Sequence, residues 1–284
     1  MTIEHQQRSA TSDGLRIAYR RLGKPGRTPL LFVHGLSYFS YDWLDVAGRL
    51  GEDRECICVD SRGFGDSDSS PAKDYSVPSM AGDLAAVVRD CGFEAVIPVG
   101  HSMGGRAAAY LTATQPTMAR ALVLVDYTPE NAPAGLKRTA ESVARVPDSF
   151  ESVDAAMMHF GIAAGSDKAQ GARERYEAYL RPVQGGFSIK RDRHFRDQFR
   201  RTLETGERPK LGVVMWKILG DVHCPILVVR GSASDMFAAD TADKVRAANA
   251  GITLVEVPSG HNIPGENPSA LAAEIRSFLT QLES

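Results

Sequence analysis

The residues with the clearest chemical meaning lie at 100–105, where the sequence reads Gly-His-Ser-Met-Gly-Gly. An apolar run at 95–99 precedes them and a helix-forming run at 106–111 follows. A serine between glycines at this spacing is typical of a sharp strand-to-helix turn that exposes a nucleophile at a helix N-terminus. A Cβ at Gly100 or Gly104 is expected to collide with the neighbouring strand and helix. The pattern therefore predicts that the Ser102 hydroxyl attacks an electrophile.

A serine hydroxyl becomes a good nucleophile only when a base takes its proton. His261 is the best candidate base, because it follows the last apolar run in a loop that Gly260 allows to bend back towards the serine. A carboxylate must orient that imidazole. We expect this carboxylate to be Asp235, just past the apolar run at 226–229; the alternative is Asp126, which ends the run at 121–125.

Negative charge on the attacked oxygen needs two backbone N–H donors. Met103, directly after the serine, is expected to supply one. Leu36 is expected to supply the other from the loop that follows the run at 30–33, since Gly35 allows that loop to turn its N–H groups inward. His34, in the same loop, is interpreted as a hydrogen-bonded residue that shapes the loop.

Short apolar runs alternate with helical segments along most of the chain. The expected strands are 30–33, 56–59, 95–99, 121–125, 226–229 and 253–257, with an antiparallel edge strand at 15–22. The expected helices are 41–50, 78–91, 102–115, 239–250 and 268–282. This order predicts a doubly wound α/β sheet whose helices cover both faces.

The alternation stops between residues 129 and 220, which predicts a mostly helical cap inserted into a core formed by residues 1–128 and 221–284. Ligands of open α/β sheets bind at the carboxyl ends of the strands. Polar residues that follow the predicted strands should therefore converge there: His34, Asp60, Ser102, Asp126, Asp235 and His261. The segment 60–67 is interpreted as a structural turn.

These motifs, in the chain order serine, aspartate, histidine, resemble those of serine hydrolases with the α/β-hydrolase fold. The resemblance extends over residues 10–282 and implies a mostly parallel, eight-stranded sheet with a cap. Relatives of this fold that use an aspartate nucleophile are set aside, because position 102 is serine. Hydrolases of carbon–carbon bonds share Ser-Met-Gly-Gly but commonly have asparagine where this chain has His101.

The resemblance implies hydrolysis of a carboxylic ester or lactone of a small to medium apolar substrate through an acyl-enzyme. The alternatives are a carbon–carbon bond hydrolase acting on vinylogous keto acids, and a ligand sensor with little turnover. Aromatic residues expected to line the substrate pocket are Tyr38, Phe39, Trp43, Phe64, Tyr127 and Trp216. The basic segment 190–201 is interpreted as a solvated helix face, or else as a surface that steers an anionic substrate.

Composition excludes several other classes. The chain has 284 residues and a formal net charge of −2, so its overall charge does not favour nucleic acid. No apolar run is long enough to span a bilayer, and residues 1–8 lack the apolar segment of a signal peptide. We therefore expect a cytoplasmic protein with reduced cysteines, acting on a small molecule as a monomer or homo-oligomer. No cofactor or metal is expected.

Overall fold

An eight-stranded sheet forms the centre of the protein in the computed structural model, which describes residues 3–163, 166, 169–207, 209 and 211–284. The strands lie in the order β1-β2-β4-β3-β5-β6-β9-β10. The parallel strands are β3 (Arg27–Val33), β4 (Arg54–Val59), β5 (Ile97–His101), β6 (Leu122–Val125), β9 (Ile226–Gly231) and β10 (Ile252–Val257). The two antiparallel strands are β1 (Gln6–Ser12) and β2 (Leu15–Gly23). The predicted mostly parallel sheet is confirmed.

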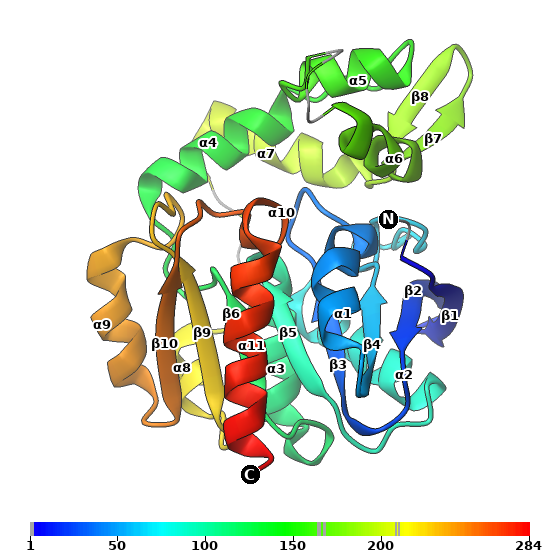
Figure 1. Ribbon diagram of the computed structural model, residues 1–284. Helices are drawn as coiled ribbons and strands as arrows, with labels where there is room; N and C mark the ends of the chain where they lie inside the picture. The colour runs from blue at the N-terminus through cyan, green and yellow to red at the C-terminus, as the bar shows by residue number, and fades with distance from the viewer. Residues whose placement is uncertain (1–2, 164–165, 167–168, 208, 210) are drawn as a thin grey trace.

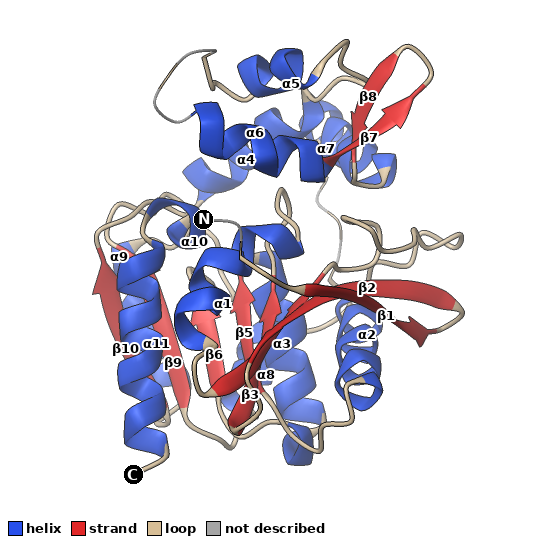
Figure 2. Ribbon diagram, turned by 45° about the vertical axis from the view of Figure 1, so that its right-hand side comes forward, coloured by secondary structure: helices blue, strands red, loops and turns tan. Residues whose placement is uncertain are grey.

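Each predicted apolar run corresponds to a parallel strand. The predicted antiparallel strand at 15–22 is also present, as β2, but it does not form the edge of the sheet. β2 lies one strand inside the sheet and β1 forms the edge. β1 was missed because it is exposed except at Ala10 and Ser12, so it carries almost no apolar signal. Figure 2 shows β1 and β2 twisted away from the direction of β9 and β10, as the right-handed twist of sheets requires.

Helices cover both faces of the sheet (Figure 1). One layer consists of α1 (Leu44–Leu50) and α11 (Pro268–Leu282), and the other of α2 (Val77–Asp90), α3 (Met103–Thr114), α8 (Met215–Gly220) and α9 (Ala239–Ala248). Strand β3 serves both layers, because Phe32 packs in the apolar cluster with α1 whereas Leu31 packs in the cluster with α2. Short helical turns connect these elements: η1 (Ser40–Trp43), η2 (Pro116–Met118) and α10 (Ile263–Glu266).

Most of the insertion lies beyond the carboxyl ends of the parallel strands, above the core in Figure 1. It comprises α4 (Pro133–Ala144), α5 (Val153–His159), α6 (Ala169–Tyr179), α7 (Arg193–Thr205) and a hairpin of β7 (Leu180–Val183) and β8 (Gly186–Ile189). The hairpin was not predicted, because strands of four residues are too short to show alternation. Helix α8 packs with α3 in the core cluster although it falls within 129–220. The domain boundaries stay a prediction.

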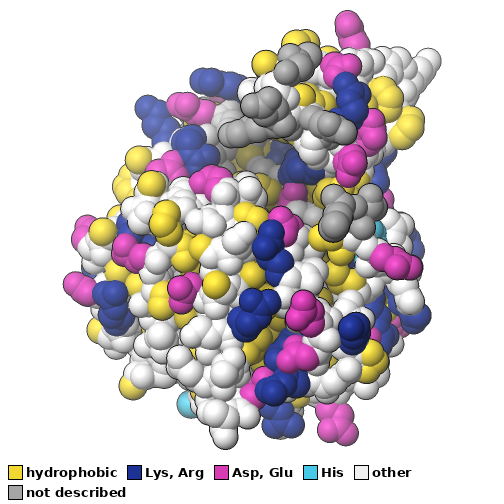
Figure 3. All heavy atoms as spheres, in the orientation of Figure 1, with side chains coloured by type: hydrophobic (Ala, Val, Ile, Leu, Met, Phe, Trp, Pro, Cys, Tyr) yellow, Lys and Arg dark blue, Asp and Glu magenta, His cyan; other side chains and the backbone are white. Residues whose placement is uncertain are grey.

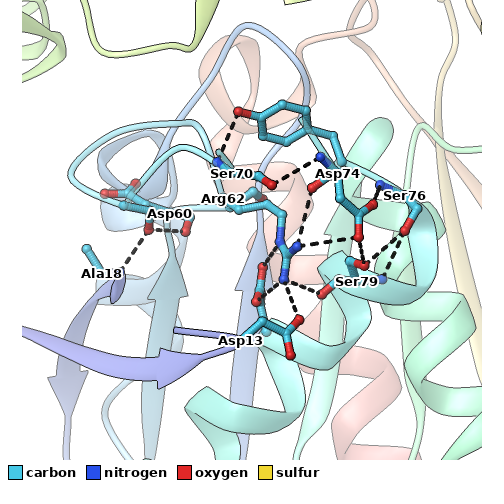
Figure 4. A network of polar contacts seen from close by, with 12 residues as sticks. Asp13, Ala18, Asp60, Arg62, Ser70, Asp74, Ser76 and Ser79 are labelled. Carbon is cyan, nitrogen blue, oxygen red and sulfur yellow. Dashed lines mark hydrogen bonds and ion pairs between the residues drawn. The ribbon is translucent and has the colours of Figure 1, made fainter. Parts of the chain in front are cut away.

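The segment 60–67 is a turn held by side-chain hydrogen bonds, as interpreted from the sequence. The Asp60 carboxylate accepts from the backbone N–H groups of Ser40 and Asp66, and its carbonyl accepts from the Ser67 hydroxyl. Within the same turn, Arg62 donates to both carboxylate oxygens of Asp83 on α2, at 2.6 and 2.7 Å, and both side chains are buried. Figure 4 shows Arg62 at the centre of this polar network.

Candidate active site

Ser102 occupies a strained turn between β5 and α3. Its φ is 51°, in the left-handed region that non-glycine residues rarely adopt. A Cβ on Gly104 would lie 2.4 Å from the carbonyl oxygen of Val33, and one on Gly100 would lie 2.7 Å from that of Gly104. The predicted strand-to-helix turn is confirmed, and it directs the serine to the carboxyl edge of the sheet. Such strain persists only where surrounding contacts impose it, and it is concentrated at functional sites.

A hydrogen-bonded relay joins three side chains from separate elements. His261 Nε2 lies 3.0 Å from Ser102 Oγ, and His261 Nδ1 lies 2.6 Å from Asp126 Oδ2. An ionised carboxylate only accepts hydrogen bonds, so we assign the imidazole proton to Nδ1, which leaves Nε2 free to accept the serine proton. The Asp126 side chain is fully buried and His261 is 13% exposed. This arrangement is suited to activating a serine nucleophile.

The prediction that Asp235 is the carboxylate that orients His261 is wrong. Its carboxylate accepts from Arg138 Nε and Nη2 at 2.5 and 2.8 Å, and these hydrogen bonds hold the pKa of Asp235 below its ordinary value. Instead, the preceding residue contacts the relay: the Ser234 hydroxyl donates to Asp126 Oδ2 at 2.5 Å. The N–H of Gly231 donates to the other oxygen at 2.8 Å. These two donors therefore fix the Asp126 carboxylate in the position where it contacts His261.

Strand order explains why Asp126 reaches the histidine. His101 pairs with Val125 across β5 and β6, and the Ser102 N–H donates to the Val125 carbonyl at 3.1 Å. Residues 102 and 126 consequently lie side by side where two neighbouring strands end. Asp126 also has a positive φ, of 42°. Its position after a strand was visible in the sequence, but the adjacency of that strand to the serine-bearing strand was not.

The two residues expected to supply the oxyanion donors lie at the cavity that reaches Ser102. Leu36 and Met103 both line it, and within the described chain no hydrogen bond engages either backbone N–H. His34 fixes the first loop, since its Nδ1 donates to the Gly35 carbonyl at 2.7 Å and its Nε2 accepts from the Ser61 N–H at 3.0 Å. The geometry agrees with a shaping role for His34. The donor roles of Leu36 and Met103 stay predictions.

A cavity of about 1490 Å³ lies between the cap and the carboxyl edge of the sheet, and it reaches Ser102 and His261. Figure 3 shows a hollow between the upper and lower parts of the molecule. Of the expected pocket residues, Tyr38 and Trp216 line this cavity. The other four are buried in apolar clusters, which corrects the prediction for Phe39, Trp43, Phe64 and Tyr127. Large aromatic side chains fill cores as readily as pockets, so residue type alone did not separate the two.

His101 is a site residue whose role the sequence did not reveal. Its Nε2 donates to the backbone carbonyl of His261 at 2.9 Å, and the two rings lie 4.8 Å apart. Burial, followed by repulsion from His261, holds the pKa of His101 well below its ordinary value. A neutral His101 thus anchors the loop that carries His261.

Acid is expected to destabilise the fold through this imidazole. Below about pH 6.5, the unfolded chain binds a proton at residue 101 that the native state excludes, so the free energy of unfolding falls as pH falls. Between pH 7.5 and 5.5, His101 should account for a loss on the order of 1 kcal/mol. Urea unfolding at the two pH values measures the loss, and His101→Asn should remove it. The exposed His223→Asn should not; equal pH dependence in wild type and His101→Asn would contradict the assignment.

The chain belongs to the alpha/beta hydrolase family, whose model matches residues 30–274. It is similar to the 3-hydroxybutyrate-oligomer hydrolase of Cupriavidus necator, at 29% identity over 93% of this chain and 92% of the relative. It is also similar to the 2-(acetamidomethylene)succinate hydrolase of Mesorhizobium japonicum, at 28% identity over 89% of each. A crystal structure of E-2-(acetamidomethylene)succinate hydrolase superposes with a TM-score of 0.84 and 26% identity, covering 98% of this chain and 100% of that one. The protein is therefore a hydrolase enzyme.

Two kinds of feature are absent from the described residues. None of their helices combines the length and apolar character needed to cross a bilayer. They also contain no group of three or more histidine, cysteine, aspartate or glutamate side chains placed to hold a metal ion.

Proposed function

We propose that the protein is a serine hydrolase that cleaves a carboxylic ester through an acyl-enzyme formed on Ser102. The observation that carries this proposal is the relay in which His261 lies 3.0 Å from Ser102 Oγ and 2.6 Å from the Asp126 carboxylate. The relay is built on strand ends beside an open cavity, where a substrate carbonyl has access to the hydroxyl.

The reaction has two halves. His261 Nε2 takes the serine proton as Ser102 Oγ bonds to the acyl carbon, and the N–H groups of Leu36 and Met103 stabilise the resulting oxyanion. His261 then protonates the leaving alcohol oxygen as its bond to carbon breaks. In the second half, His261 deprotonates a water molecule that attacks the acyl-enzyme, and the carboxylic acid leaves as the proton returns to Ser102 Oγ. Asp126 stays ionised and holds the imidazole throughout.

A fluorophosphonate probe tests the activated nucleophile directly. We expect one molecule of probe to bond to Ser102, seen as a single mass increase and localised by peptide mass spectrometry, and no increase for Ser102→Ala. The labelled protein should lose its activity towards p-nitrophenyl esters in proportion to labelling.

Three outcomes would overturn the proposal. Absence of labelling together with tight ligand binding would favour the sensor. Labelling at another residue would displace Ser102. Cleavage of a dienoate ketone without ester cleavage would favour the carbon–carbon bond hydrolase.

A further inference from the structure

Four arginines line the cavity in the part of the chain that the structure describes, and they differ in whether a carboxylate neutralises them. Arg138 forms two hydrogen bonds to Asp235, and Arg175 forms two to Asp42. Arg106 and Arg191 have no carboxylate within ion-pair distance among the described residues. Among the described residues, no carboxylate therefore neutralises the guanidinium groups of Arg106 and Arg191 in the cavity.

Arg106 lies on α3, one helical turn after Ser102. No hydrogen bond or ion pair to its guanidinium occurs within the described residues. Burial lowers the pKa of Arg106, and the neighbouring Tyr127 partly offsets this effect. The Tyr127 hydroxyl is itself buried and without a described hydrogen-bond partner. This half-buried arginine thus lies one helical turn from the nucleophile, and within the described residues its guanidinium has no partner.

Arg191 reaches the cavity from the segment before α7 and is 5% exposed. Its Nη1 lies 3.4 Å from the Ser37 hydroxyl, and its Nη2 is buried without a described partner. Ser37 follows Leu36, so Arg191 lies on the side of the expected oxyanion loop. Burial lowers the pKa of Arg191, Tyr179 acts in the opposite direction, and among the described residues no carboxylate lies within ion-pair distance.

The acidic side chains at the cavity do not compensate these two charges. Asp42, Asp74 and Glu130 line it in the described chain, and each faces another cation: Arg175, Arg62 and Lys244. Removing a guanidinium from water without an anionic partner costs free energy, and a bound carboxylate offsets that cost with two parallel hydrogen bonds. An anion is therefore the ligand that fits this part of the cavity.

We infer that the enzyme acts on acyl compounds that carry a carboxylate, held by Arg106 one helical turn from Ser102, with Arg191 supplying a second positive charge in the cavity. This inference rests on the proposed function for the bond that is cleaved. The names of two relatives contain such anions, 3-hydroxybutyrate and succinate. The apolar substrate expected from the sequence is replaced by one with an acidic end.

Binding to the Ser102→Ala protein tests the inference without requiring turnover. Monomethyl succinate and methyl butanoate differ by a carboxylate in place of a methyl group. Calorimetric titration should give at least about tenfold tighter binding for the anion, with an affinity that falls as salt rises. In the same Ser102→Ala background, Arg106→Gln should lower the ratio of the two affinities at least about tenfold, and Arg191→Gln should lower it about two- to fivefold. Arg89→Gln, on the exposed end of α2, is the matched control and should change nothing.

A second readout separates a binding role from a structural one. Because Arg106 is unbalanced in the free protein, Arg106→Met should raise the urea midpoint of unfolding. Succinate should raise the midpoint of the wild type and not that of Arg106→Met. Preference for methyl butanoate, or an Arg106→Gln effect below twofold, would overturn the inference. Such a result alongside normal fluorophosphonate labelling would leave the serine hydrolase proposal intact.

Discussion

Asp126→Asn is expected to lower kcat by about 10⁴-fold, a smaller loss than the one expected for Ser102→Ala. The substitution keeps the shape of the side chain, but the amide offers an N–H to His261 Nδ1. The imidazole then carries its proton on Nε2, where it can no longer accept the serine proton at 3.0 Å. Steady-state hydrolysis of a p-nitrophenyl ester measures the loss, and the fluorophosphonate labelling rate should fall in parallel.

Asp235→Asn is the matched control. It also replaces a carboxylate by an amide, but at the residue after Ser234, which pairs with Arg138 and does not contact His261. It weakens a pair whose side chains are 53% and 36% exposed, so kcat should fall by less than about fivefold. Loss of activity in Asp235→Asn together with retention in Asp126→Asn would reverse the assignment of the carboxylate. Unchanged urea midpoints would show that both variants fold.

Asp83→Ala is expected to lower the free energy of unfolding by about 3 kcal/mol, because it removes the buried carboxylate that pairs with the buried Arg62 guanidinium at two points. Both side chains are 2% exposed in the wild type. Arg62 would keep single contacts with the exposed carboxylates of Asp13 and Asp74, at 3.2 and 3.9 Å. Water screens these exposed carboxylates, so they replace only part of the two-point buried pairing that Asp83 provides. Urea unfolding with an unchanged m-value measures the difference.

An exposed ion pair provides the comparison for this stability prediction. Asp45→Ala removes the partner of Arg49 one turn along α1, where the side chains are 51% and 44% exposed, and it should cost less than about 0.5 kcal/mol. Replacing both members of the buried pair, as Arg62→Met with Asp83→Leu, should recover much of the lost stability. A cost below about 1 kcal/mol for Asp83→Ala would show that water reaches Arg62.

Local chemistry made much of the fold and part of the site predictable from the sequence. Glycines 100 and 104 identified the turn at Ser102 because a Cβ at either position meets backbone atoms. Buried strands were visible as apolar runs because both faces of the sheet are covered. Edge strand β1 lacked that signal, since its side chains are mostly exposed.

What the sequence could not supply was the position of strands relative to one another. Asp126 and Asp235 both follow strands, and only the order β5-β6-β9 puts the first beside the serine. The same limitation applies to the pocket. Whether Phe64 lines a cavity or packs against Phe195, at a ring separation of 4.6 Å, depends on how the cap lies on the core.

The turn after β9 contacts both α4, which lines the cavity, and the proposed catalytic groups. Ser234 donates to Asp126, and the Ala233 N–H donates at 3.0 Å to Ser259, two residues before His261. Two backbone N–H groups at the start of α4, from Ala132 and Gly135, donate to the carbonyls of Met236 and Asp235. A bulky substrate that lifts α4 would therefore also tilt the imidazole. Selectivity for substrate size should consequently act on the rate of acyl transfer as well as on affinity.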